Sequence, residues 1–151
     1  DSAFATTAME AAQEAFAAPV EVLINNAGVI VRRDAVDTSD DEWRAVMQTN
    51  VDGVFYLSRA FAQQLVYDGA IVNVSSIAAK FGVPGSGVLY AASKGAVNSL
   101  TIGLSQEVAG EGIRVNAVAP GLTATDMPPP ERLDRDGPNL PFGRAGQPGR
   151  L

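Results

Sequence analysis

Tyr90 and Lys94 are the side chains whose types and spacing could carry proton chemistry in this sequence. Positions i and i+4 of a helix lie on one face, so a phenol and an ammonium would be neighbours if residues 89–109 are helical. Ser75 and Ser76 end the strand predicted before this helix and add hydroxyl groups at the same edge. The Tyr-x-x-x-Lys spacing alone is weak evidence for a catalytic pair. The competing interpretation is an ordinary helix surface on which a Tyr and a Lys occur by chance. Small residues surround the pair and permit close approach of a ligand or another helix: Ala91, Ala92, Ser93, Gly95 and Ala96.

The absence of His and Cys from the 151 residues narrows the chemistry further. It excludes disulfides, thiolate nucleophiles, Cys-ligated zinc, a Ser-His-Asp triad and a His-Glu-x-x-His site. Proton transfer therefore depends on Asp, Glu, Tyr or Lys, and no metal site is expected.

The net charge of -6 argues against a nucleic-acid partner. No signal peptide and no apolar run long enough for a membrane span are recognisable, so we expect a cytoplasmic protein without membrane association.

Helical and strand patterns alternate along the chain. Helices are predicted over residues 3–17, 39–66 and 89–109, and strands over 20–24, 70–74 and 113–118. This alternation predicts an α/β fold with a parallel sheet and helices on its faces. The strands lack a clean polar/apolar alternation, as expected when both faces are covered.

The carboxyl ends of the predicted strands are expected to line one crevice, because ligands bind beyond those ends in open α/β sheets. The segments concerned are residues 25–28, 75–76 and 120–125. We interpret residues 1–151 as a single partial domain. Residues 126–151, which are rich in proline, are predicted to form a flexible substrate loop or tail.

Five motifs occur in order along the chain and are together far more specific than any one alone. They are Asn25-Asn26-Ala27-Gly28, Asn50-Val51-Asp52-Gly53, Val72-Asn73-Val74-Ser75-Ser76, Tyr90-Ala91-Ala92-Ser93-Lys94 and Pro120-Gly121. On these motifs the sequence resembles the short-chain dehydrogenase/reductase family, classical type, over nearly its whole length. The resemblance implies a partial doubly wound, Rossmann-type sheet with helices on both faces. It also implies hydride transfer between NAD or NADP and a small-molecule carbonyl or alcohol, in a homodimer or homotetramer.

The resemblance implies four catalytic residues. Tyr90 would be the general acid/base and Lys94 its neighbouring cation, which also bonds the nicotinamide ribose. A phenol has a pKa of about 10, and lowering it by about three units takes roughly 4 kcal/mol. A lysine cation about 4 Å away, at an effective dielectric near 20, supplies roughly that much. Ser76, with Ser75 as its rival, would hold the substrate oxygen. Asn50 would bend its helix and hold a relay water, unless it is an ordinary helix-face asparagine.

The same resemblance implies the cofactor contacts. Asn26, Ala27 and Gly28 would lie against the adenosine ribose. The nicotinamide end would be held by Tyr90, Lys94, Pro120, Gly121, Thr123 and Thr125.

The sequence departs from the family at both ends, since the glycine-rich half and the last strand are absent. No Gly-x-x-x-Gly-x-Gly motif occurs, so these 151 residues alone are expected to bind NAD(H) or NADP(H) weakly or not at all. A second hypothesis is therefore a non-catalytic fragment that folds or assembles. A third, a Ser-Lys hydrolase using Ser76 and Lys94, is disfavoured because no Ser-x-x-Lys spacing occurs.

Overall fold

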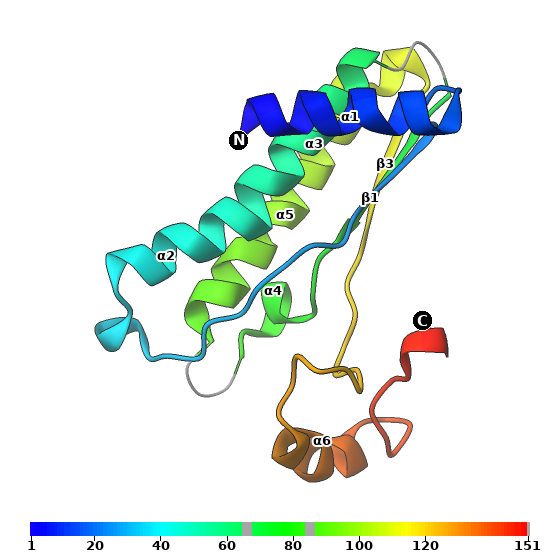
Figure 1. The fold of residues 1–151 in the computed structure, drawn as a ribbon. Coiled ribbons are helices and arrows are strands. Elements are labelled where there is room, and N and C mark those ends of the chain that lie inside the picture. The colour runs from blue at the N-terminus through cyan, green and yellow to red at the C-terminus, as the bar shows by residue number, and fades with distance from the viewer. Residues whose placement is uncertain (65–67, 84–86, 151) are drawn as a thin grey trace. The chain divides into compact units, whose positions relative to one another are not determined.

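The computed structural model describes residues 1–64, 68–83 and 87–150 and has a parallel three-stranded sheet flanked by helices (Figure 1). The strands are β1 (Val22–Asn25), β2 (Ala70–Val74) and β3 (Arg114–Val118), in that order across the sheet. The α-helices are α1 (Ser2–Phe16), α2 (Asp40–Met47), α3 (Gly53–Gln64), α4 (Ala78–Phe81), α5 (Val88–Glu107) and α6 (Pro130–Asp136). Shorter helical segments are η1 (Ala35–Asp37), the π-helical η2 (Gln48–Asp52), η3 (Ala109–Glu111), η4 (Gly137–Asn139) and η5 (Pro148–Arg150).

The predicted Rossmann-type α/β class is confirmed, and two local differences bear on the site. The helix predicted over residues 39–66 is divided by η2 into α2 and α3, with residues 65–67 outside the described residues. The predicted loop after Ser76 contains α4, and residues 84–86 within that loop also lie outside the description.

Ser39 and Glu42 explain why α2 begins where it does. The Ser39 hydroxyl accepts a hydrogen bond from the Glu42 amide at 3.2 Å, and the Glu42 carboxylate accepts one from the Ser39 amide at 2.9 Å. This is the predicted capping box. The hydrogen bonds to Ser39 also lower the pKa of Glu42, because they favour the charged carboxylate.

The hydrophobic core covers one face of the sheet. Leu23, Ile71 and Val115 are neighbours in the strand register and are buried together. Residues of α1 and α3 pack on them, namely Ala5, Met9, Ala60 and Phe61. Val22 and Ile24, which point to the opposite face, are 55% and 62% exposed. Burial therefore alternates along β1 even though its residue types do not.

Residues Ala119–Leu151 form a second compact unit, separate from Asp1–Val118. Within it, Thr123 and Gly146 pair as an isolated parallel bridge. The guanidinium of Arg132 lies 3.3 Å from the Asp136 carboxylate across one turn of α6. None of the helices in the described residues combines the length and apolar character that a membrane span needs.

Candidate active site

Tyr90 and Lys94 lie one turn apart near the start of α5, and both side chains are buried. The Lys94 Nζ atom lies 5.8 Å from the centroid of the Tyr90 ring. It donates a hydrogen bond of 2.7 Å to the carbonyl oxygen of Val74, the last residue of β2. Burial lowers the pKa of Lys94, because desolvation disfavours the charged ammonium. The phenol ring and the amine are thus held near the carboxyl end of the middle strand.

The two serines after β2 have different environments. Ser75 is buried, and its hydroxyl donates to the Lys94 main-chain carbonyl at 3.2 Å. Ser76 is partly exposed, and its hydroxyl accepts a hydrogen bond from the Ala78 amide at 3.1 Å, at the start of α4. Ser75 therefore ties β2 to α5, whereas Ser76 lies toward solvent.

Asn50 is fully buried within the π-helical segment η2. Its Oδ1 atom accepts from the Val29 amide at 2.8 Å, and its Nδ2 donates to the Val29 carbonyl at 2.9 Å. Nδ2 also donates to the Ser93 hydroxyl at 3.0 Å. The side chain therefore joins the segment after β1 to α5. A π-helical turn is rare and is frequently found at functional sites.

Gly28 packs against this arrangement. A Cβ atom placed on it would lie 3.3 Å from Lys94 Nζ and 3.5 Å from Asn50 Oδ1. The distance to Lys94 Nζ is shorter than a Cβ atom usually makes with a neighbour, so the Lys94 amine would have to move slightly. Asn26 and Ala27, which precede Gly28, are exposed.

A buried layer of polar side chains lies at the sheet beside these residues. Asn25 Nδ2 donates to the Ser58 hydroxyl at 3.0 Å and to Asn73 Oδ1 at 2.9 Å. Asn73 Nδ2 donates to the Thr101 hydroxyl at 2.9 Å, which donates in turn to the Val97 carbonyl at 2.8 Å. These bonds connect β1 and β2 to α3 and α5.

Four of the predicted cofactor-binding residues belong to the second unit. They are Pro120, Gly121, Thr123 and Thr125. The Thr123 hydroxyl donates to the Gly121 carbonyl at 3.2 Å, and the Thr125 hydroxyl accepts from the Met127 amide at 3.3 Å. The structure thus brings Gly28, Asn50 and Lys94 close together within the first unit. The four predicted cofactor-binding residues named above belong to the second unit.

Two contributors were missed by the sequence reasoning. In the sequence Ser93 stands out only as a small residue, although it lies beside Lys94 in the Tyr-x-x-x-Lys motif. Thr101 lies about two helical turns after Lys94 and is a polar residue on the buried face that also contains Val97. A search for polar residues on buried helix faces would have found both.

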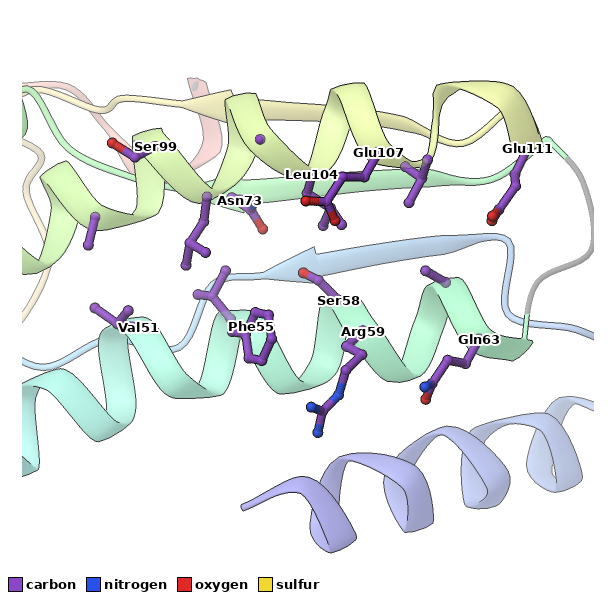
Figure 2. Close-up of a pocket in the computed structure, with 16 residues that line it drawn as sticks. Val51, Phe55, Ser58, Arg59, Gln63, Asn73, Ser99, Leu104, Glu107 and Glu111 are labelled. Atoms are coloured by element: carbon purple, nitrogen blue, oxygen red, sulfur yellow. The ribbon is translucent and has the colours of Figure 1, made fainter.

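A groove of about 800 Å³ lies between α3 and α5 (Figure 2). Apolar side chains dominate its lining, with Arg59 on the α3 side and Glu107 on the α5 side. Figure 2 shows Ser58 and Asn73 deeper between the helices. The four predicted catalytic residues are not among the residues that line this groove.

The parallel sheet and flanking helices define a Rossmann-type α/β domain, and solved structures share it. A dehydrogenase/reductase from Sinorhizobium meliloti superposes with a TM-score of 0.90 at 31% identity, over 98% of this chain and 59% of that one. A short-chain dehydrogenase from Burkholderia cenocepacia, solved in complex with NADP, gives a TM-score of 0.88 at 35% identity, over 97% of this chain and 60% of that one.

Sequence comparison identifies the family. The family model for short chain dehydrogenases matches residues 1–136. The chain belongs to the short-chain dehydrogenase family. Galactitol 2-dehydrogenase (L-tagatose-forming) of Cereibacter sphaeroides is 45% identical, over 97% of this chain and 61% of that enzyme. The chain therefore spans about three fifths of the length of that relative.

Proposed function

We propose that the full protein is an NAD(P)-dependent oxidoreductase that interconverts a carbonyl and an alcohol group on a small-molecule substrate. The observation that carries this proposal is the buried Lys94 beside Tyr90 at the carboxyl end of β2. Membership of the family and the dehydrogenase names of its relatives support the reaction class. The NADP complex of the Burkholderia cenocepacia relative supports a nicotinamide dinucleotide, and the choice between NAD and NADP stays open.

Gly28 supports the fit of a dinucleotide at this edge of the sheet. A Cβ at position 28 would lie 3.3 Å from Lys94 Nζ and would press the amine out of place, whereas glycine lets a ligand approach the backbone there. We assign cofactor contacts to Asn26, Ala27, Gly28, Tyr90, Lys94, Pro120, Gly121, Thr123 and Thr125. When bound, a nicotinamide supplies or accepts the hydride.

Tyr90 performs the proton transfer in this proposal. Its hydroxyl donates a proton to the substrate oxygen during reduction and accepts it back during oxidation. The Lys94 ammonium stabilises the phenolate, because opposite charges attract strongly where water is excluded. The hydrogen bond from Lys94 to the Val74 carbonyl keeps that cation at the strand end.

Ser76 orients the substrate oxygen, and Ser75 has a structural role. The Ser75 hydroxyl proton is already donated to the Lys94 carbonyl. The Ser76 oxygen accepts from the Ala78 amide, which is compatible with donation of its own proton to a substrate.

Asn50 supports the relay of protons between Lys94 and solvent. Because its side-chain amide is bonded to Val29 and Ser93, we assign the relay water to the main chain of Asn50.

The homo-oligomer implied by the family is supported by the groove between α3 and α5. The groove presents apolar side chains together with Arg59 and the carboxylates of Glu107 and Glu111. A second copy related by a two-fold axis could bury the apolar lining and pair Arg59 of one copy with an acidic side chain of the other. We therefore propose this groove as the interface of a homodimer, or of one dimer within a homotetramer.

The alternative function is a non-catalytic fragment. The absence of a Gly-x-x-x-Gly-x-Gly motif from these residues favours it for the 151-residue chain taken alone. An assay of nicotinamide absorbance on the full protein, with polyol and ketose substrates and with either dinucleotide, separates the two. Substrate-dependent oxidation or reduction supports the oxidoreductase. A folded protein that neither binds a dinucleotide nor turns over any carbonyl or alcohol supports the alternative.

A further inference from the structure

Ser93 is fully buried in α5 between the two proposed catalytic residues. Its hydroxyl donates to the Tyr90 main-chain carbonyl at 2.8 Å and accepts from Asn50 Nδ2 at 3.0 Å. We propose that Ser93 is a positioning residue, which fixes the Asn50 amide and thereby couples the segment after β1 to the catalytic helix. The effect on turnover rests on the proposed function, whereas the coupling itself does not.

The hydrogen-bond inventory of Asn50 shows why the Ser93 hydroxyl matters. A side-chain amide has two N–H donors and one carbonyl acceptor. One N–H goes to the Val29 carbonyl, the carbonyl oxygen accepts from the Val29 amide, and the remaining N–H goes to Ser93. Removing the hydroxyl would leave a buried N–H of Asn50 without its acceptor. An unpaired buried donor costs free energy, so the Asn50 side chain is expected to change its conformation.

The local bond to Tyr90 does not by itself argue for a special role. Serine hydroxyls often bond a carbonyl in the preceding helical turn. Ser105 makes the same bond in α5, to the Ile102 carbonyl at 2.8 Å, in an exposed setting. The bond from Asn50 is what distinguishes Ser93, and Ser105 is therefore a matched control on the same helix.

The consequence reaches the catalytic lysine through Gly28. This residue precedes Val29, and a Cβ on it would lie within 3.5 Å of both Lys94 Nζ and Asn50 Oδ1. A displaced Asn50 amide would loosen Val29 and alter the packing of Gly28 against the Lys94 amine. Ser93 thus holds together the segment after β1, η2 and α5.

Amide hydrogen exchange in the full protein tests the coupling without any substrate. In Ser93→Ala, the Val29 amide should exchange roughly tenfold faster or more, because its acceptor on Asn50 becomes mobile. Ser105→Ala should leave Val29 unchanged, and the Ile71 amide in β2 should be unchanged in both. Unchanged exchange at Val29 in Ser93→Ala would overturn the proposal.

A second variant keeps the test decisive if Ser93→Ala loosens the sheet. Should the Ile71 amide also accelerate, Ser93→Cys replaces the hydroxyl with a weaker acceptor and adds no cavity. Faster exchange at Val29 but not at Ile71 supports the proposal, and slow exchange at both overturns it.

Kinetics then tests whether Ser93 acts through Asn50. Ser93→Ala should lower kcat by about tenfold or more with little change in KM. In an Asn50→Ala background, the same substitution should change kcat by less than about twofold, because coupled residues are not additive. An equal loss in both backgrounds would overturn the proposal. If the full protein catalyses no nicotinamide-dependent reaction, the proposed function fails and the exchange result still decides the coupling.

Discussion

At the scale of single residues, Lys94 combines burial with one hydrogen bond to a main-chain carbonyl. Burying an ammonium in this way lowers the free energy of unfolding of the protein, because one hydrogen bond compensates only part of the lost hydration. The same burial brings its cation beside the Tyr90 ring, where the proposed reaction requires it.

The burial of Lys94 predicts a pH-dependent stability. Its pKa in the folded chain lies below the ordinary 10.5. At a pH below the pKa of Lys94 in the folded chain, the amine is protonated in the folded and the unfolded state alike. The folded state then bears the whole desolvation cost of the ammonium. As the pH rises toward about 10.5 the folded state loses the proton first, so the unfolding free energy rises relative to Lys94→Met, by at most about 1.4 kcal/mol per pH unit.

Urea unfolding of the full protein and of Lys94→Met between pH 7 and 10 measures this difference. Lys80→Met, which removes an exposed ammonium, is the control for net charge. A difference that stays flat or falls with rising pH would show that Lys94 carries no such cost.

Gly28→Ala is predicted to impair activity without unfolding the protein. The added Cβ would lie 3.3 Å from Lys94 Nζ and would displace it. Small displacements of catalytic groups lower the reaction rate strongly. We expect kcat to fall by about tenfold or more. Gly95→Ala in α5 is the control, because its added Cβ would meet no atom within 4 Å apart from its chain neighbours and the adjacent backbone of its own helix. Equal activity of the two variants would argue against a functional contact at Gly28.

At the scale of elements, the polar layer under the strand ends fixes α5 to the sheet. Thr101→Val would remove the acceptor of Asn73 Nδ2, a buried amide group. We expect a loss of about 1–3 kcal/mol of unfolding free energy, measured by urea unfolding.

Thr6→Val is the matched control for this prediction. The Thr6 hydroxyl also bonds the carbonyl four residues earlier, that of Ser2, but on the exposed surface of α1. Its substitution should change stability by less than about 0.5 kcal/mol. Similar losses for both variants would mean that the bond to Asn73 contributes nothing specific.

The elements that were predictable from sequence are those with local signals. The capping box of Ser39 and Glu42 marks the start of α2, and β-branched apolar residues mark β2. The π-helical segment at Asn50 was not predictable from local sequence, because the bonds of Asn50 to Val29 and Ser93 span 21 and 43 positions. The short α4 was not predictable because it has only 4 residues and its N-cap residue, Ile77, has no polar side chain to signal a helix start.

The candidate site was predictable to a similar extent. The one-turn spacing of Tyr90 and Lys94 follows from helical geometry and is present in α5. The close approach of Gly28 to the Lys94 amine joins the segment after β1 to a helix more than sixty positions later. Sequence spacing carries no information on such an approach, which depends on the register of the whole sheet.

At the scale of the whole molecule, the α3–α5 groove predicts self-association. Phe55 lines this groove and is 44% exposed. Phe55→Asp in the full protein should shift the proposed oligomer toward smaller species in analytical ultracentrifugation, because a buried carboxylate disfavours an apolar interface. Phe81→Asp changes an exposed phenylalanine of α4 that does not line the groove and should leave the assembly intact. An unchanged mass for Phe55→Asp would place the interface elsewhere.

The 151-residue chain is predicted to bind NAD(H) and NADP(H) weakly or not at all. It contains no Gly-x-x-x-Gly-x-Gly turn to hold a pyrophosphate at a helix N-terminus. Isothermal titration of the chain alone should therefore show no micromolar binding, in contrast to the full protein. Micromolar affinity of the isolated chain would disprove this expectation.

The central claim is that the Tyr90 hydroxyl transfers the proton, and Tyr90→Phe in the full protein tests it most directly. The account predicts that kcat falls by about a hundredfold to ten-thousandfold, while the melting temperature stays close to that of the parent protein. Tyr56→Phe, which keeps the aromatic ring beside Arg59 on α3, should retain activity. A Tyr90→Phe protein that turns over its substrate at near the parental rate would contradict the account.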